Sequence, residues 1–148
     1  MRASLEHIPY LVENMRAGDV KEVEAFSGST PAQALRKGIG RSKASLTAMT
    51  IAGEPLVMFG VAPLSEITRT GIPWLLGTDA ALYYRREFMR EGRRYLAAML
   101  DEYPNLVNYV HIENKASIIW LKRLGFTLDE AVPTGVKQEL FHKFYIKR

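Results

Sequence analysis

Apolar residues recur at helical spacing over the first part of the chain. The apolar positions that share one helical face there are Leu5, Ile8, Leu11, Val12 and Met15. Gly18 follows this pattern, where a helix end is expected. The sequence therefore predicts an opening helix.

Two more helices are expected before residue 42. Asp19 is placed to cap a helix that runs to Phe26, with Glu22 three residues later as in a capping box. Ser29 or Thr30 precedes a proline, which is preorganised for the first helical position, and Gly38 and Gly40 mark the end of that third helix.

The pattern changes to short runs typical of strands after residue 44. Residues 45–51 and 56–62 read as two strands joined by a turn at 52–55. Residues 72–76 form a short apolar run between two glycines, as expected of a buried central strand.

The second half alternates helices with strands. A long helix is predicted over 83–103, with one apolar stripe and arginines on the opposite face. A strand follows over 106–112, and Asn114 is placed to cap a helix that ends at Gly125. A last strand is expected over 139–147.

This order predicts one α/β domain over 1–148. Its mixed central sheet would have N-terminal helices, then a β-hairpin, then a β-α-β-α-β run. No repeat, low-complexity segment or linker divides the chain.

The amino-acid composition excludes several kinds of functional site. The chain has no cysteine, which excludes disulfides, thiolate metal sites and a cysteine nucleophile. His7, His111 and His142 are far apart in sequence, so no metal ligand set is expected. There is no apolar run of about 20 residues and no signal peptide, and we expect a cytoplasmic protein. The net charge of +4 favours anionic partners.

The most specific motif lies at residues 114–126. It has an asparagine after a strand, a small residue three positions later, an apolar helix and then a basic residue, Gly and Phe. Asn114, Ser117, Arg123, Gly125 and Phe126 supply these positions. The motif resembles the closing motif of the GNAT superfamily of N-acetyltransferases, and the order of elements matches that fold over nearly the whole chain.

A narrower resemblance rests on residues 73–79, the arginine-rich helix and residues 106–110. These segments look like a group of small GNAT-like phage proteins related to the internal virion protein A of short-tailed phages. Asn114 and a set of residues near the start of the chain also look like that group: Asn14, Met15, Arg16, Asp19, Glu22 and Val23. This resemblance places the protein in the cytoplasm of a host cell or in a virion.

The superfamily resemblance implies an acyl-CoA N-acyltransferase fold and transfer from acetyl-CoA to a primary amine, with no metal. The coenzyme would lie between two splayed strands, residues 72–76 and 106–112, and its pyrophosphate would meet the helix that begins near Tyr84. The implied cofactor-binding residues are Leu75, Leu76, Gly77, Arg85, Arg86, Arg90, Asn114 and Ser117.

Two departures from the family pattern put that activity in question. The phosphate-binding loop of relatives carries several glycines, whereas here only Gly92 is present, inside the expected helix. The arginines at 85, 86 and 90 could bind phosphate instead, or form a solvated face offset by Glu87 and Glu91. Leu121 stands where many relatives have a tyrosine acid, and leucine cannot donate a proton.

The candidates for a general base are His111 on a strand and Asp79 just after the central strand, with Glu113 as a further choice. Each also has a structural reading, His111 as a core residue and Asp79 as a helix cap.

Three readings of function remain open. The first is an N-acyltransferase that uses a CoA thioester and an unidentified amine. The second is a phage-encoded virion, assembly or binding protein with an inactive GNAT scaffold, whose partners would be phage structural proteins. The third uses the arginine face to bind nucleic acid, but no nucleic-acid-binding motif is visible and we do not expect that partner.

Overall fold

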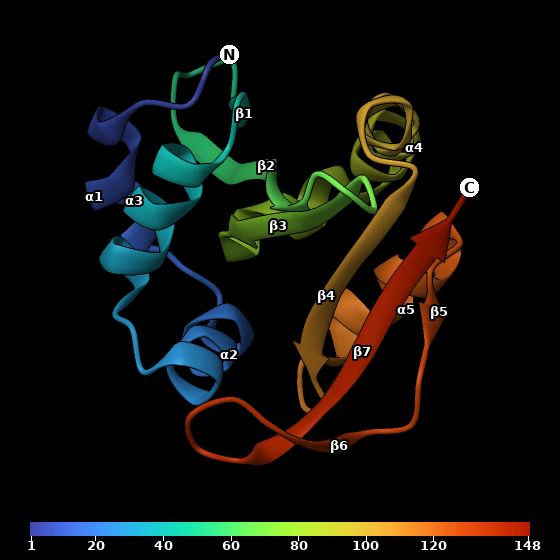
Figure 1. The fold of residues 1–148 in the computed structure, drawn as a ribbon. Helices are drawn as coiled ribbons and strands as arrows, with labels where there is room; N and C mark the ends of the chain where they lie inside the picture. The colour runs from blue at the N-terminus through green and yellow to red at the C-terminus, as the bar shows by residue number, and fades with distance from the viewer.

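The computed structural model describes residues 1–148 as one seven-stranded mixed sheet with helices on both faces (Figure 1). The helical elements are η1 (Leu5–His7), α1 (Ile8–Glu13), α2 (Ala17–Ser27), α3 (Pro31–Arg41), η2 (Asp79–Tyr84), α4 (Arg85–Glu102) and α5 (Lys115–Leu124). The strands are β1 (Ser45–Met49), β2 (Pro55–Ser65), β3 (Thr70–Gly77), β4 (Asn105–His111), β5 (Thr127–Leu128), β6 (Val132–Thr134) and β7 (Glu139–Lys147). None of the helices is long and apolar enough to cross a membrane.

The strand order is β1-β2-β3-β4-β7-β5, with β6 paired to β7. The β3–β4 pair is parallel, and the other pairs are antiparallel. At the β1 edge, Thr47 donates its backbone N–H to the Met1 carbonyl, so the N-terminal residues cover part of an otherwise open edge.

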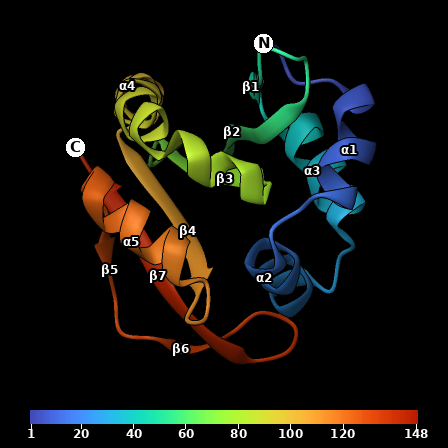
Figure 2. The same cartoon turned by 180° about the vertical axis from the view of Figure 1, so that it is seen from behind.

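Two apolar cores lie on opposite faces of the sheet, one under α1 and α3 and the other under α4 and α5 (Figure 2). Met58 and Leu76 face the first core, whereas Val61, Leu106 and Phe144 face the second. The division follows from the strand period of two, because neighbouring residues point to opposite faces.

Several predicted ends are confirmed. Thr30 caps α3 in a capping box with Gln33, and Pro31 is the first helical residue. Gly125 ends α5 in the left-handed conformation, at φ 104°. The last predicted strand matches β7 over its full length.

Other local predictions are wrong. Gly18 does not end the opening helix, because α1 ends at Glu13 and Gly18 lies inside α2. Asn114 is at the N-cap position of α5, but its side chain makes no capping hydrogen bond there. Asp19 does not cap α2, which begins at Ala17; it lies inside the first turn with its side chain buried. Gly38 does not end α3, because the helix continues to Arg41. Gly38 is instead a packing glycine: a Cβ there would lie 2.7 Å from the Trp74 ring, whereas a Cβ at Gly40 would meet nothing within 4 Å.

This difference gives a matched test within one helix. Gly38→Ala should lower the free energy of unfolding by about 1–3 kcal/mol, because the added methyl collides with Trp74. Gly40→Ala should instead raise it by up to about 1 kcal/mol, because alanine favours helix and the position is open. Urea unfolding of the two variants beside the parent measures both. Equal effects would contradict the packing role of Gly38.

Candidate functional site

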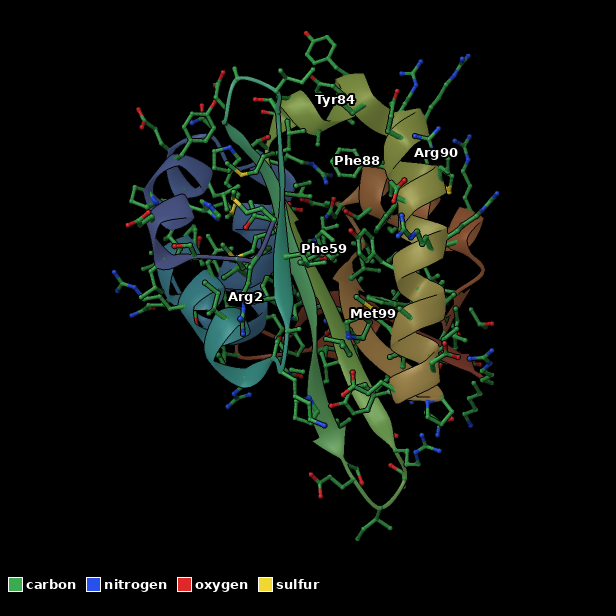
Figure 3. All side chains as sticks on the ribbon, turned by 90° about the horizontal axis from the view of Figure 1, so that it is seen from above. Arg2, Phe59, Tyr84, Phe88, Arg90 and Met99 are labelled. Carbon is green, nitrogen blue, oxygen red and sulfur yellow. The ribbon has the colours of Figure 1, made fainter.

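The central feature of the sheet is the separation of β3 from β4. The two strands pair only at Thr70 with Asn105 and at Gly71 with Leu106, and then they diverge (Figure 1). A groove of about 2130 Å³ passes along this opening and reaches both faces of the sheet. On the α4 side it runs between the strands and α4, where Phe59, Phe88 and Met99 point (Figure 3).

The ladder of β3 sets which backbone groups face the opening. Thr78 donates its N–H to the Leu56 carbonyl of β2. Since hydrogen-bonded positions alternate along an antiparallel pair, Pro73, Leu75 and Gly77 turn their backbone groups toward β4. Because proline has no N–H, this edge has two donors, the N–H groups of Leu75 and Gly77, and three acceptors, the carbonyls of all three residues.

The Asn108 side chain bridges the opening at Pro73. Its Nδ2 donates to the Pro73 carbonyl at 2.7 Å, and its Oδ1 accepts the Tyr109 N–H at 2.8 Å. A continued parallel register would pair those two backbone groups directly. One carboxamide is therefore inserted into a rung of the ladder, and it satisfies both groups that the divergence separates.

The start of α2 occupies the wide end of the opening. The Gly77 N–H donates to Asp19 Oδ2 at 2.9 Å, and the Gly77 carbonyl accepts the Arg16 N–H at 2.9 Å. Asn114, at the N-cap position of α5 after β4, joins this group. Its Oδ1 accepts from Arg16 Nη2 at 3.1 Å, and its Nδ2 donates to Asp19 Oδ1 at 3.3 Å. Leu75 alone keeps both backbone groups facing the groove with no side-chain partner.

Glu22 is the acidic residue of α2 that lines the groove. Its Oε1 accepts the His111 N–H at 2.7 Å, and its Oε2 lies 3.4 Å from Asn114 Nδ2. Burial raises the pKa of Glu22 to about 7, and the nearby Asp19 carboxylate adds to the shift. Burial also raises the pKa of Asp19, although Arg16 opposes that change. Sequence reasoning treated Glu22 as a helix-capping residue and missed its position in the groove.

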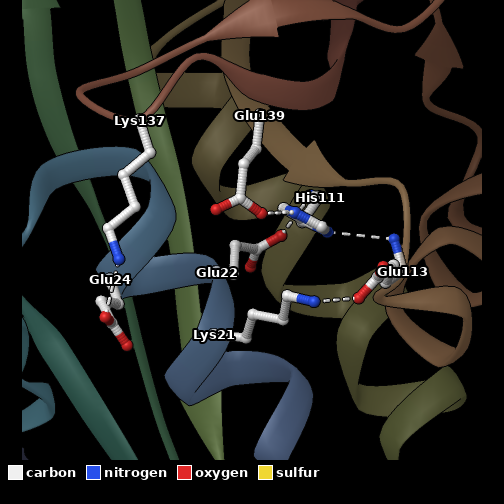
Figure 4. Close-up of polar contacts among 7 residues, drawn as sticks. All are labelled: Lys21, Glu22, Glu24, His111, Glu113, Lys137 and Glu139. Atoms are coloured by element: carbon white, nitrogen blue, oxygen red, sulfur yellow. Dashed lines mark hydrogen bonds and ion pairs between the residues drawn. The ribbon is translucent and has the colours of Figure 1, made fainter.

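His111 is buried beside this cluster, and both of its ring nitrogens are engaged (Figure 4). Nδ1 accepts the Glu113 N–H at 3.1 Å, which leaves the proton on Nε2 to be donated to Glu139 Oε1 at 2.8 Å. In this arrangement the imidazole has no free lone pair, and the ring does not line the groove. Glu113 is exposed and forms an ion pair with Lys21.

Asp79 lies elsewhere. It is the first residue of η2 and sits in a small separate hollow of about 290 Å³, together with Tyr10 and Glu13. Thr78, not Asp79, is the N-cap of η2. A catalytic role for Asp79 or His111 stays a prediction.

Five of the implied cofactor-binding residues line the groove: Leu75, Leu76, Arg85, Arg86 and Ser117. Gly77 and Asn114 are buried in the group of hydrogen-bonded residues at the start of α2, here called the α2 cluster (Arg16, Asp19, Gly77 and Asn114). Arg90 is exposed, with its Nε 3.7 Å from a Glu91 carboxylate oxygen. Whether any of the eight binds a cofactor stays a prediction.

Gly92, the one glycine of α4, has a packing role. Gly92 lies in the middle of α4, and a Cβ there would come within 3.0 Å of the Trp120 ring. It therefore allows α4 and α5 to approach each other. The Trp120 indole N–H is buried without a hydrogen-bond partner, although Trp120 lines the groove. No group of three or more His, Asp and Glu side chains is placed to hold a metal ion.

Solved acetyltransferase structures are similar to this chain over nearly its whole length. A putative phosphinothricin N-acetyltransferase has a TM-score of 0.72 at 13% identity, covering 99% of this chain and 96% of that one. Spermidine N-acetyltransferase from Vibrio cholerae, in complex with CoA and spermine, has a TM-score of 0.69 at 10% identity, covering 99% and 92%. Ribosomal-protein-alanine N-acetyltransferase from Brucella melitensis has a TM-score of 0.65 at 13% identity, covering 100% and 98%. The chain thus has the predicted GNAT-like α/β fold.

Sequence comparison adds one partial match. A family model described as bacteriophage T7, probable scaffold protein Gp13, matches residues 72–131, which is less than half of the chain. No curated protein matches the sequence.

The raised pKa of Glu22 predicts a pH-dependent stability. The folded state holds its proton up to about pH 7, whereas the unfolded state releases it near 4.5. This contribution is therefore complete below pH 4.5 and is lost as the pH rises to 7. Because Glu22 is half-buried, we expect a loss on the order of 2 kcal/mol. Glu22→Gln cannot titrate, so its free energy of unfolding should fall less over this range.

Urea unfolding at several pH values measures the difference between parent and variant. Glu113→Gln is the control, since Glu113 is exposed and its ion pair with Lys21 lowers its pKa. Parallel pH profiles for the parent and Glu22→Gln would contradict the burial of an uncharged Glu22.

The Asn108 bridge predicts a local change in hydrogen exchange. Asn108→Ala removes the acceptor of the Tyr109 N–H, so this amide should exchange faster, and the protein should lose about 1 kcal/mol of stability. Asn105→Ala is the control on the same strand, because it removes one side-chain bond to Thr68 at the closed end. Unchanged exchange at Tyr109 in the Asn108 variant would refute the bridge.

Proposed function

We propose that the protein is an N-acyltransferase that moves an acyl group from a CoA thioester, acetyl-CoA in the simplest case, to a primary amine. The observation that carries this proposal is the groove through the β3–β4 opening, which the Leu75 backbone faces. A substrate on the α4 face and a substrate on the opposite face could meet there. The GNAT-like fold supports the same reaction class by analogy.

The α4 side of the groove offers groups that suit such a thioester. Arg85 and Arg86 line the groove at the start of α4, form no ion pair within the protein, and are suited to phosphate. The unpartnered Trp120 N–H is a buried donor that a ligand could satisfy. The Pro73 carbonyl and the Tyr109 N–H, which Asn108 now bridges, would suit an amide of the pantetheine arm.

The reaction needs a carbonyl-binding donor and a route for one proton. As the amine nitrogen bonds to the acyl carbon, the carbon–sulfur bond breaks and the sulfur leaves as thiolate. The Leu75 N–H is the free donor that would face the carbonyl oxygen. Glu22 would accept the proton that the amine loses, because its pKa of about 7 suits a general base at neutral pH. Leu121 lines the groove and cannot protonate the thiolate, so water would do so.

Neither predicted catalytic residue is the base in this proposal. His111 donates its backbone N–H to Glu22 and is held by Glu139, so it would position the base. Asp79 lies outside the groove and has no step here.

The alternative function is that of a binding or assembly protein. The partial match to a phage family described as a probable scaffold protein fits a binding or assembly protein that retains the fold without the reaction. The Asn108 bridge and the α2 cluster, which occupy most backbone groups of the opening, also fit that function.

Titration calorimetry with acetyl-CoA and CoA tests the acyltransferase proposal. We expect saturable micromolar binding by the parent protein. Replacing Arg85 and Arg86 together with alanine should weaken it about tenfold, which corresponds to about 1.4 kcal/mol. Replacing Arg93 and Arg94 removes the same charge from α4 outside the groove and should have little effect.

Asn108→Ala should change the affinity for acetyl-CoA in the opposite direction. Because the ligand no longer displaces a carboxamide, acetyl-CoA should bind this variant more tightly than the parent. If neither protein binds acetyl-CoA at millimolar concentration, the acyltransferase proposal fails and the assembly function takes its place.

A further inference from the structure

The groove has a second mouth on the face of the sheet away from α4. Its rim includes residues of α2, α3, β3, β4 and β7 (Figure 1). If the proposed thioester enters along α4, this mouth is the side left for the amine. Its chemistry therefore indicates which amines can approach.

Aromatic rings form the walls of this mouth. Tyr109 and Phe26 stack with their centroids 5.6 Å apart and their planes at 27°. On the opposite wall, the Trp74 ring packs on Gly38, and its indole N–H donates to Ser42 Oγ at 2.8 Å. These contacts hold both walls in place, so a substrate would meet rigid apolar surfaces.

Three cations on the rim have no carboxylate partner, although Lys143 Nζ lies 5.8 Å from the centre of the Tyr145 ring. Lys37 and Arg41 project from α3, and Lys143 lies on β7 directly across from Tyr109. None of the three forms an ion pair within the protein.

The acidic groups near this mouth are already engaged. Glu24 is paired with Lys137, and Glu139 is bonded to His111 (Figure 4). Glu22 and Glu54 line the groove, but Glu22 accepts the His111 N–H and Glu54 accepts the Tyr10 hydroxyl. The rim therefore carries an uncompensated positive charge, which attracts anions and repels polycations.

We propose that this mouth selects an anionic primary amine, a small molecule that carries a carboxylate or phosphate and an apolar or planar body beside its amine. Lys37, Arg41 and Lys143 bind the anionic group, and the rings of Phe26, Trp74 and Tyr109 contact the body. The inference rests on the proposed acyl transfer for the role of the amine, but binding at the mouth can be measured without a thioester.

Three dipeptides test it by calorimetry: Phe-Glu, Phe-phosphoserine and Phe-Lys. Each has the same aromatic ring, a free amine and an amidated C-terminus, so the second side chain is the only source of the anion. We expect at least one acidic dipeptide to bind ten times more tightly than Phe-Lys, and the better of the two identifies carboxylate or phosphate. The advantage should shrink as salt is added. Phe-Lys binding as tightly as both acidic dipeptides, or no binding by either acidic dipeptide, overturns the proposal.

Charge reversal locates the binding. Lys37→Glu combined with Lys143→Glu should abolish the preference for the acidic dipeptide. Lys115→Glu combined with Lys122→Glu makes the same charge change on α5 outside the groove and should preserve it. Equal loss in both double variants would contradict binding at this mouth. If an acidic dipeptide binds but acetyl-CoA does not, only the acyltransferase proposal is refuted. If acetyl-CoA binds but neither acidic dipeptide does, only the anionic acceptor is refuted.

Discussion

The need to satisfy backbone hydrogen bonds where β3 and β4 part governs the rest of the structure. A strand edge facing a parting in a sheet exposes N–H and C=O groups that are costly to leave unpaired. This chain meets that constraint in three ways: Pro73 removes a donor, Asn108 bridges one rung, and the start of α2 binds both backbone groups of Gly77. Only Leu75 keeps a donor and an acceptor for a ligand. Because the protein itself supplies partners for almost all of these backbone groups, the separation of β3 from β4 can persist without a ligand. The same side chains also limit which ligands can enter the opening.

The same constraint makes α2 a connection between the two halves of the sheet. Two residue pairs join β3 to β4, and beyond them the connection runs through the Asn108 side chain and then through Asp19, Asn114 and Arg16. Two acidic side chains, Asp19 and Glu22, share one asparagine there, with a single arginine nearby. Glu22 itself bonds α2 to the His111 N–H and lies 3.4 Å from Asn114 Nδ2. In the proposed reaction, the side chain that joins α2 to the end of β4 is therefore also the one that accepts the proton.

Local patterns predicted the elements but not the site. The capping box at Thr30, Gly125 at the end of α5 and the alternation in β7 depend on neighbours in sequence, so these features could be predicted from the sequence. Asp19 and Glu22 also have capping-box spacing, yet their partners are Gly77, His111 and Asn114, which lie far along the chain. Nothing in the local sequence distinguishes a carboxylate that caps a helix from one that is buried across a sheet. For the same reason Asn108 read as an ordinary strand residue, and β5 and β6 were too short to show a period.

The cations at the second mouth of the groove, Lys37, Arg41 and Lys143, could compensate for the leucine that stands at position 121 in place of a tyrosine acid. A cationic surrounding disfavours a second positive charge, so it lowers the pKa of an amine held beside Lys37, Arg41 and Lys143. The amine would then lose its proton more readily, and a weak base such as Glu22 would suffice. The same field, with Arg85 and Arg86 at the other end of the groove, would stabilise a thiolate until water protonates it. The anion of the acceptor offsets only part of the positive charge of the rim, so the ammonium form can bind there while its pKa is still lowered. The loss of the tyrosine acid and the charge of the second mouth are thus consistent with one mechanism, in which the electrostatic field replaces a proton donor.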